Sequence, residues 1–391
     1  FVMLLCHMRS SFSMSLLYHA YVYLEFLILA CTIYILAPLR VNRFWVDDNE
    51  DEIALLEREI NHNIQKRQKE LELTIALTNY CNFSCVYCYQ NKNEKLMTTE
   101  VANMIIEKID RILNDNIFEG INIHYFGGEP LLNIPVLIYL DENIKKITDK
   151  IGIVYKAFLT TNGSMLSKEL LQKVKFSSIQ LTFDGLEKTH DRLRVSDHFH
   201  FKEEIELIEN IMNFSQAKVL LRTNICKENK DEIIALHKYI FEKFGNERIE
   251  INPNRTIKYH QDDSFEMLSV QEYAEVAYQI KLLWSEQKGK FELPVPRSTP
   301  CKFPYGNAYA ISPEGYCTFC SGSMDQEKKY FFDVDIENKK MFSVRKECKK
   351  CNILPLCLGG CIIQYNLRAG ACTYEKYELK NILISYIKHI S

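Results

Sequence analysis

Three cysteines within eight residues, Cys81, Cys85 and Cys88, carry the strongest chemical signal in the sequence. Three thiolates on one loop can hold three irons of a [4Fe–4S] cube, which needs four protein ligands for full ligation. The missing ligand leaves one iron open to bind another molecule, so such a cluster could act on a substrate. Zinc would want a fourth Cys or His close by, and none follows before His124. We therefore interpret the motif as an iron–sulfur site with a vacant corner.

A second group of cysteines lies near the carboxyl end of the chain. Of 14 cysteines in all, seven form a series there: Cys301, Cys320, Cys348, Cys351, Cys357, Cys361 and Cys372. Tight C-x-x-C groups in an intracellular enzyme more often hold metal than disulfides, and ligand thiols must stay reduced. We therefore expect a cytoplasmic protein. A Cys₄ zinc site remains an alternative for the four cysteines between 348 and 361, and it would leave the others unused.

Strands that alternate with helices must position these loops. The expected strands are 71–78, 121–126, 153–160, 178–183, 218–224 and 248–252. The expected helices are 98–113, 134–147, 167–174, 202–213, 231–244 and 270–287. This alternation is typical of parallel βα units. We predict an α/β fold with a partial (β/α)₆ TIM-type barrel, whose chemistry lies at the carboxyl ends of the strands.

Polar segments follow successive strands of this expected barrel. Gly127-Gly128-Glu129-Pro130 follows the second strand, where glycines allow close backbone approach and a carboxylate can accept from an ammonium group. The next strands end in Thr161-Asn162-Gly163, Thr182-Phe183-Asp184-Gly185 and Arg222-Thr223-Asn224. Each segment alone is also ordinary turn chemistry. Because all of them converge on one mouth, we expect a binding site there.

The first cysteine motif, with the aromatic Tyr87 before its last cysteine, resembles the signature of the radical S-adenosylmethionine (SAM) superfamily. The resemblance implies that Cys81, Cys85 and Cys88 bind the cluster and that SAM chelates the open iron. One electron, from a donor such as flavodoxin or ferredoxin, would then release a 5′-deoxyadenosyl radical that abstracts hydrogen. The implied cofactor contacts are Tyr87, Gly127, Gly128, Glu129, Pro130, Asn162, Thr182, Asp184 and Arg194. Relatives usually carry Ser where Thr182 stands.

The second cysteine series resembles the SPASM domain, an auxiliary iron–sulfur module of radical SAM enzymes. By the family arrangement, one auxiliary [4Fe–4S] cluster takes Cys301, Cys320 and Cys361. The other takes Cys348, Cys351, Cys357 and Cys372. Cys317 is either a fourth ligand of the first auxiliary cluster or a buried apolar thiol.

Three regions follow from these motifs: an N-terminal segment 1–70, a radical SAM core 71–290 and a SPASM domain 291–391. Leu16–Leu39 is long enough to span a bilayer, but it contains His19 and Glu25, and a charge at mid-span is costly. We therefore do not expect a membrane segment. Residues 34–46 suggest a hairpin and Asp47–Glu52 open a helix, a module that could pair a strand with a peptide.

The resemblance implies an enzyme that matures a ribosomally made peptide through a crosslink such as a thioether. A sulfatase-maturing enzyme is the alternative, but that group usually has Asp after the cysteine that corresponds to Cys320, and Ser321 stands here. A non-catalytic zinc or iron–sulfur protein is the contrasting class. The formal net charge of -3 offers no basic excess for nucleic acid.

Overall fold

The computed structural model describes residues 51–390 except 116–117, 246–247, 259–263, 290–293, 319, 324–328, 335–340 and 362–371. The stretch Leu16–Leu39 and the hairpin expected over 34–46 lie outside the described residues. The chain divides into two units, Phe1–Leu56 and Glu57–Ser391, and the second contains the whole sheet. Within the described residues, no helix combines the length and apolar character that crossing a bilayer requires.

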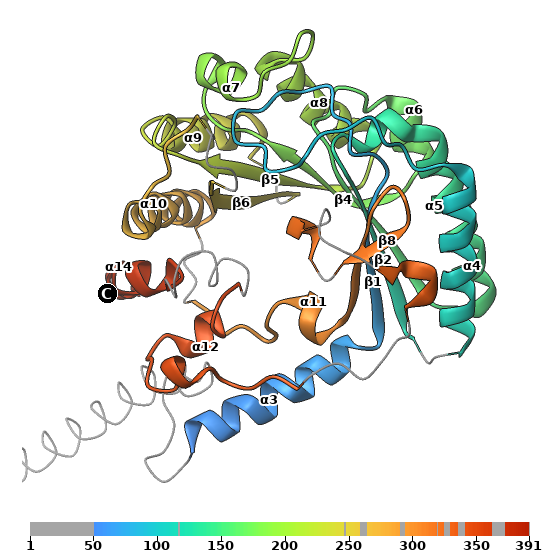
Figure 1. The fold of residues 1–391 in the computed structure, drawn as a ribbon. Coiled ribbons are helices and arrows are strands. Elements are labelled where there is room, and N and C mark those ends of the chain that lie inside the picture. Colours follow the sequence, from blue (N-terminus) through green and yellow to red (C-terminus); the bar gives the residue numbers. More distant parts are fainter. Residues whose placement is uncertain are drawn as a thin grey trace, which may run out of the picture. The chain divides into compact units, whose positions relative to one another are not determined.

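Six parallel strands form the main part of the sheet, as the sequence predicts. They are β1 (Glu70–Ala76), β2 (Gly120–Phe126), β3 (Val154–Thr160), β4 (Phe176–Thr182), β5 (Lys218–Ile225) and β6 (Ile249–Arg255). The helices after them are α4 (Thr99–Asp115), α5 (Ile134–Ile151), α6 (Lys168–Lys173), α7 (Glu187–Leu193), α8 (Phe201–Phe214), α9 (Ile233–Phe244) and α10 (Val270–Lys288). Figure 1 shows these helices along the outer side of the curved row of strands. The α/β fold and its partial barrel are confirmed.

The core lies between the strands and these helices. Leu71, Leu73 and Ile75 alternate along β1 and are completely buried or nearly so. On α4 the buried side chains include Ala102 and Ile105, followed by Ile109 and Ile112 at helical spacing. Burial of such apolar faces against the sheet stabilises each βα unit.

The inner side of the strands is polar. His124 Nε2 on β2 lies 2.7 Å from Thr160 Oγ1 on β3, and Asn252 on β6 donates to Gln180 Oε1 on β4 over 3.3 Å. Burial lowers the pKa of His124 to about 4, so its imidazole is neutral at physiological pH. The interior of the partial barrel therefore contains polar groups that form hydrogen bonds with one another.

The cysteine-rich region extends the same sheet. Strand β7 (Asn307–Ile311) pairs in parallel with β1, and β8 (Tyr316–Thr318) and β9 (Lys329–Tyr330) add antiparallel strands. The sheet order is β6-β5-β4-β3-β2-β1-β7-β8-β9. The remaining elements here are the helices α11 (Lys302–Tyr305), α12 (Leu354–Cys357) and α14 (Glu375–Ile390) and the short 3₁₀ helices Ser321–Ser323, Phe331–Asp333 and Lys346–Cys348. The boundary near residue 290 stays a prediction, since strands from both sides of it share one sheet.

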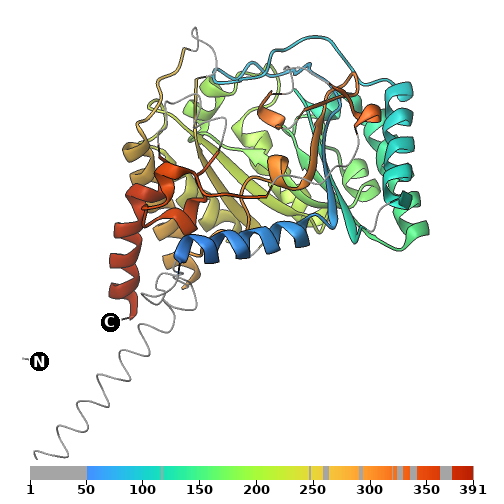
Figure 2. The same cartoon turned by 60° about the horizontal axis from the view of Figure 1, so that its bottom comes forward.

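Helix α3 (Glu52–Arg67) precedes β1 and begins where the sequence predicts a helix. From Glu57 onward it contacts the cysteine-rich region. Asn61 exchanges two hydrogen bonds with the backbone of Phe342, of 2.7 and 3.0 Å, and Glu57 Oε1 accepts from Val344 N over 2.7 Å. Figure 2 shows this helix crossing beneath the sheet.

A chain truncated after Gly289 should aggregate. The truncation removes β7 and leaves the backbone donors and acceptors of β1 without their partner between Leu71 and Ile75. Size-exclusion chromatography would measure the loss of monomer relative to the full chain. A monodisperse truncated protein would contradict this view of β7 as part of the core sheet.

Candidate functional site

The loops at the carboxyl ends of β1 to β5 meet at one edge of the sheet. The loop after β1 carries Cys81, Cys85 and Cys88, and all three side chains are partly exposed. Its middle is held by Phe83, which is buried and packs against Phe199. The predicted convergence of strand-end segments is thus seen in the structure (Figure 1).

The cysteine loop is fastened to the segment that follows α7. Ser84 N donates to Val195 O over 2.8 Å, and Val86 N donates to Leu193 O over 3.0 Å. Arg194 lies between these two acceptors, and its guanidinium carbon is 5.4 Å from the centre of the Phe83 ring. The backbone of this segment therefore holds the loop, and its arginine lies beside it.

The thiols of the loop influence one another. Burial raises the pKa of Cys85 to about 11; Arg194 opposes this shift, and Cys88 and Cys81 add to it. Burial also raises the pKa of Cys81, which accepts a hydrogen bond from Phe83 N at 3.4 Å. The backbone N–H of Phe83, two residues after Cys81, suits a thiolate, because an N–H donor stabilises negative charge on sulfur.

Glu129 connects three of the strand-end loops. Its side chain is completely buried, and Oε1 accepts from Leu131 N at 2.9 Å and from Thr161 Oγ1 at 2.7 Å. Oε2 accepts from Asn162 N at 2.7 Å. Burial raises the pKa of Glu129 to about 7, although these donors and Arg194 oppose the shift. The carboxylate therefore positions the ends of β2 and β3; the predicted contact with a methionine ammonium remains a prediction.

The two glycines before Glu129 permit close contact with the start of the cysteine loop. Gly128 N donates to Thr78 O over 2.8 Å, and Glu129 N donates to Tyr80 O over 2.9 Å. A Cβ on Gly128 would lie 2.1 Å from Tyr80 O, and one on Gly127 would lie 2.4 Å from Thr78 O. Glycine is required here because two backbones touch. Pro130 begins the short 3₁₀ helix Pro130–Asn133, for which Glu129 is the cap.

Asp184 connects the other half of the site. It is completely buried, Oδ1 accepts from Asn224 N at 2.6 Å, and Oδ2 accepts from the Tyr87 hydroxyl. Asn229 Nδ2 donates to the Asp184 carbonyl over 2.8 Å. Burial raises the pKa of Asp184, with Arg194 and Tyr87 opposing. Tyr87 of the cysteine loop is thereby tied to the ends of β4 and β5.

A buried ion pair supports Arg194. Glu204 on α8 is completely buried, with His190 Nε2 at 3.1 Å and Arg194 Nε at 4.0 Å from its Oε2. Burial disfavours the charge on Arg194, but Glu204 and the other anionic groups nearby hold its pKa well above the usual range. Thr182, also predicted as a contact, is buried at the end of β4.

The cysteine-rich region brings its thiols into two neighbourhoods. The pKa of Cys301 is raised, first by burial and then in part by the Cys361 thiol. That of Cys348 is raised by burial and, to a smaller extent, by the thiols of Cys351 and Cys372. Two further thiols, of Cys320 and Cys357, accept from Gly322 N at 3.3 Å and from Gly359 N at 3.4 Å, as Cys81 accepts from Phe83 N.

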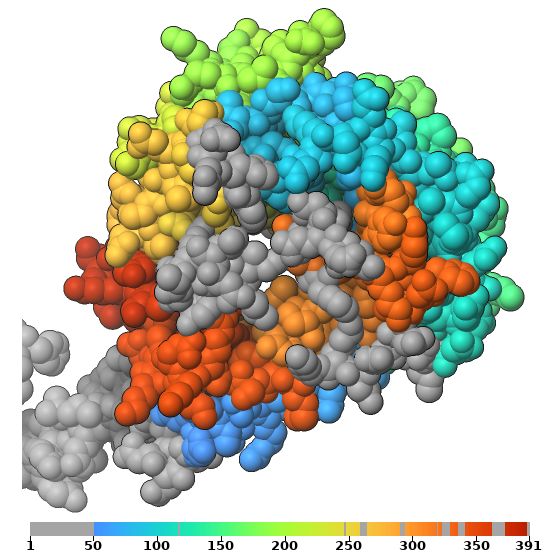
Figure 3. Space-filling model, viewed as in Figure 1, coloured from blue at the N-terminus to red at the C-terminus, as the bar shows by residue number. Residues whose placement is uncertain are grey.

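Cys317 lies on β8 within the main apolar core, beside Ile311 in the register of β7. This position suits a packing thiol. The turn between β7 and β8 contacts the segment that follows β1, because Glu314 in the turn forms an ion pair with Lys95. Figure 3 shows the orange β7–β9 region at the surface next to the segment that follows β1.

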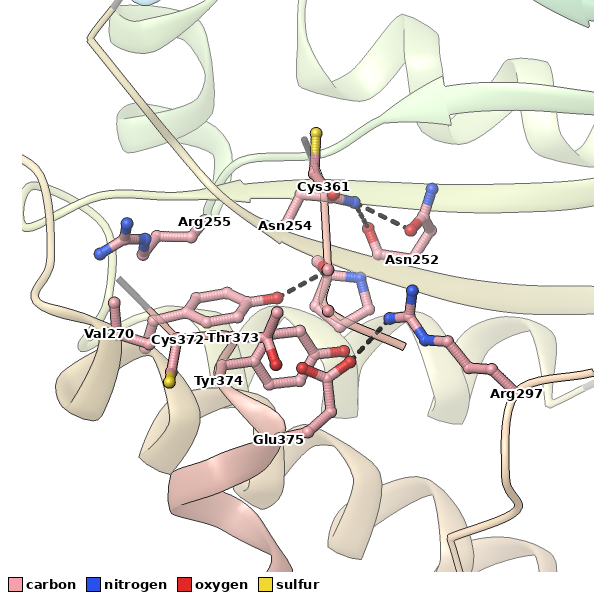
Figure 4. A pocket seen from close by; sticks show the side chains of 14 residues that line it. Asn252, Asn254, Arg255, Val270, Arg297, Cys361, Cys372, Thr373, Tyr374 and Glu375 are labelled. Carbon is pink, nitrogen blue, oxygen red and sulfur yellow. Dashed lines mark hydrogen bonds and ion pairs between the residues drawn. The ribbon is translucent and has the colours of Figure 1, made fainter. Parts of the chain in front are cut away.

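A cavity of about 340 Å³ opens between β6 and the cysteine-rich region. Its walls are polar: Asn252 and Asn254 come from β6, and Arg297 pairs with Glu375 over 2.7 Å. Cys361 and Cys372 also line it (Figure 4). The cavity offers donors and acceptors to a polar molecule close to thiols of both neighbourhoods.

The donor groups fit an iron–sulfur cluster and an anionic ligand. Three thiols in mutual electrostatic reach suit a cube in which each sulfur binds a different iron. Within the described residues, no group of three or more His, Cys, Asp and Glu side chains is arranged to hold a single metal ion. Arg194 Nε is buried, lies 4.0 Å from Glu204 Oε2 and makes no hydrogen bond within the described part of the chain, so the guanidinium can still donate to a carboxylate ligand.

Sequence reasoning missed several residues of this site. Glu204 lies on the buried face of α8 with Phe201 and Ile208, and a carboxylate at such a core position was the signal for it. Asn229 and Asn82 gave no signal, because asparagine in a loop is ordinary turn chemistry.

Comparison with known families agrees with this geometry. Residues 75–240 match the sequence model of the Radical SAM superfamily. This part of the chain is therefore similar to the radical SAM superfamily of enzymes. The match covers strands β2 to β5, the last two residues of β1, and the cysteine loop, Glu129, Asp184 and Arg194.

Among relatives, the radical SAM cyclopropyl synthase TigE of Paramaledivibacter caminithermalis is 24% identical over 372 residues, covering 83% of this chain and 76% of TigE. The GTP 3',8-cyclase of Helicobacter pylori is 31% identical over 186 residues, covering 46% of this chain. The matched stretch spans only 53% of that cyclase, and 39% of a Methanocaldococcus jannaschii protein that is 34% identical.

Among solved structures, anSMEcpe with bound AdoMet is similar with a TM-score of 0.65 and 18% identity, covering 82% of this chain and 100% of that one. Streptococcus suis SuiB bound to S-adenosylmethionine has a TM-score of 0.56 and 16% identity, covering 89% of this chain and 88% of SuiB. At such identities the likeness establishes the fold.

Replacing Gly128 by Ala should lower the free energy of unfolding by roughly 3 kcal/mol, because the new Cβ meets the Tyr80 carbonyl at 2.1 Å. The control is Gly152→Ala, at the end of α5, where the φ of 81° strains the backbone but no atom lies within 4 Å. That variant should lose only about 1 kcal/mol. Urea denaturation measures both, and equal losses would contradict the close-contact argument.

The stability contribution of Glu129 should fall as pH rises. Its folded pKa of about 7 lies above the ordinary 4.5, so the folded protein binds an extra proton between these values. The advantage over Glu129→Gln, whose side chain does not titrate, should therefore be on the order of 2–3 kcal/mol greater at about pH 5 than at about pH 8. Urea denaturation of both proteins at the two pH values tests this. A constant difference would contradict it.

Proposed function

We propose that this protein is a radical SAM enzyme that modifies a peptide. The observation that carries the proposal is the cysteine loop, fixed at the carboxyl edge of the sheet by Glu129 and Asp184 with Arg194 beside it. Cys81, Cys85 and Cys88 would hold a [4Fe–4S] cluster. When bound, the cluster and SAM supply one-electron cleavage and hydrogen abstraction.

The residues around the loop would bind and orient SAM. Arg194, whose guanidinium lies beside Phe83 of the loop, would receive the SAM carboxylate while it stays paired with Glu204. Thr182, Asp184 and Asn162 stand at successive strand ends around it. Tyr87 would fix the loop through its hydrogen bond to Asp184 rather than bind through its hydroxyl.

A peptide as substrate is supported by the similar structures and by the cavity. The solved forms of anSMEcpe include one with a bound Cp18Cys peptide, and those of SuiB include one with the precursor peptide SuiA. In this chain the cavity beside β6 offers the amides of Asn252 and Asn254 and the Arg297–Glu375 pair. Amide side chains and an ion pair can bond to peptide groups and charged side chains alike.

The cysteine-rich region would bind two auxiliary clusters as a SPASM domain. Cys301 and Cys361 share one neighbourhood, as a first cluster with Cys320 would require. Cys348, Cys351 and Cys372 share the other, and Cys357 responds to Cys351. These clusters would accept the surplus electron or bind a substrate thiolate, after a donor such as flavodoxin or ferredoxin has reduced the first site. A cytoplasmic location would keep all these thiols reduced.

Anaerobic incubation with SAM and dithionite should yield 5′-deoxyadenosine, and Cys85→Ala should abolish that product because it removes a cluster ligand. Cys351→Ala should spare SAM cleavage but reduce peptide modification. The control is Cys226→Ser, which replaces a buried thiol outside both cysteine groups and retains its donor to Asn229. Mass spectrometry quantifies the product. Reconstituted protein that never forms 5′-deoxyadenosine would defeat the proposal.

A further inference from the structure

The side-chain amide of Asn162 faces the sulfur of Cys81. Nδ2 lies 3.9 Å from Cys81 Sγ and 2.8 Å from Asn82 Oδ1, and the residue is 8% exposed. An amide nitrogen has two hydrogens, so it can serve both acceptors at once. The amide therefore has a donor available for the sulfur.

The orientation of this amide is fixed by its other end. Asn162 Oδ1 accepts from Ser164 N at 3.0 Å and from Ser164 Oγ at 2.7 Å. A flipped amide would turn its hydrogens toward the Ser164 N–H and its oxygen toward two acceptors, Asn82 Oδ1 and the sulfur. The hydrogen-bond network thus assigns Nδ2, and not Oδ1, to the side of Cys81.

The position of Asn162 is fixed as well. Its backbone N donates to the buried Glu129 carboxylate over 2.7 Å, and Asn82 Nδ2 donates to Ser164 Oγ over 2.9 Å. The second bond ties the residue after Cys81 to the loop after β3. Asn162 is therefore held on two sides, and its amide cannot swing away from the sulfur without breaking several hydrogen bonds.

We propose that Asn162 is a positioning residue that sets the reduction potential of the cluster through an N–H···S bond to Cys81. This inference rests on the proposed function, in which Cys81 is a cluster ligand. Reduction adds one electron, supplied by a low-potential donor, and increases the negative charge on the sulfurs. A donor N–H stabilises that reduced state and raises the potential. No bond to Asn162 breaks, and its proton stays on nitrogen.

Asn162→Leu removes the donor at similar volume and should shift the midpoint potential to more negative values. Asn162→Asp should shift it further, because it also places a carboxylate beside the sulfur. The matched control, Asn143→Leu, makes the same change on α5, where Asn143 Nδ2 donates to Tyr139 O outside the site, and should leave the potential near that of the wild type. Reductive titration with dithionite, followed by electron paramagnetic resonance (EPR), measures the potential. The signal that changes when SAM is added identifies the cluster at Cys81.

The outcomes separate the two proposals. A wild-type protein without any SAM-responsive cluster signal overturns the proposed function and this inference with it. A normal signal with an unshifted potential in Asn162→Leu overturns only the inference. If neither Asn162 variant takes up iron, a measurement on the wild-type protein still tests the inference. Asparagine labelled with ¹⁵N in its side chain should give a ¹⁵N coupling in pulsed EPR of the reduced cluster, retained in Asn143→Leu and lost in Asn162→Leu. Its absence in the wild type overturns the inference.

Discussion

Two buried carboxylates hold the candidate site together. Glu129 and Asp184 are both completely buried, and a carboxylate without partners would be costly there. Each instead collects hydrogen bonds from neighbouring loops: Glu129 from the loops after β2 and β3, and Asp184 from the cysteine loop and the end of β5. Because a displaced loop would leave a buried carboxylate oxygen without its donor, these hydrogen bonds favour the observed geometry of the site.

Arg194 is the cation that these acids share. It opposes the rise in the pKa of Cys85, Asp184 and Glu129, and it forms its own pair with Glu204. A single buried guanidinium among so many acidic groups lowers the cost of gathering thiolates on one loop. The same guanidinium charge remains available to an anionic ligand. The residue that lowers the electrostatic cost of the cysteine loop is therefore also suited to bind a carboxylate.

The sequence predicted the six core strands and the convergence of their polar ends, because period and spacing report burial directly. It could not predict that the carboxylates of Glu129 and Asp184 accept hydrogen bonds from backbone N–H groups. Asn162 N and Asn224 N come within reach of them only when the strands pair in this register. Nor could it predict β7, a short strand whose parallel pairing with β1 joins residues far apart in the chain. The division of the cysteine-rich thiols into two neighbourhoods was expected only from the resemblance, not from their spacing.

Strand β1 links the two groups of cysteines mechanically. The first cysteine loop leaves its carboxyl end, and β7 pairs along its length between Cys301 and Cys320. The turn after β7 reaches the same edge of the sheet, where Glu314 pairs with Lys95 at the far end of the cysteine loop. A strand hydrogen-bonded on both sides is among the stiffest elements of a fold. The β1–β7 pair therefore places Cys301 and Cys320 on either side of a strand that shares the sheet with the strand leading into the first cysteine loop.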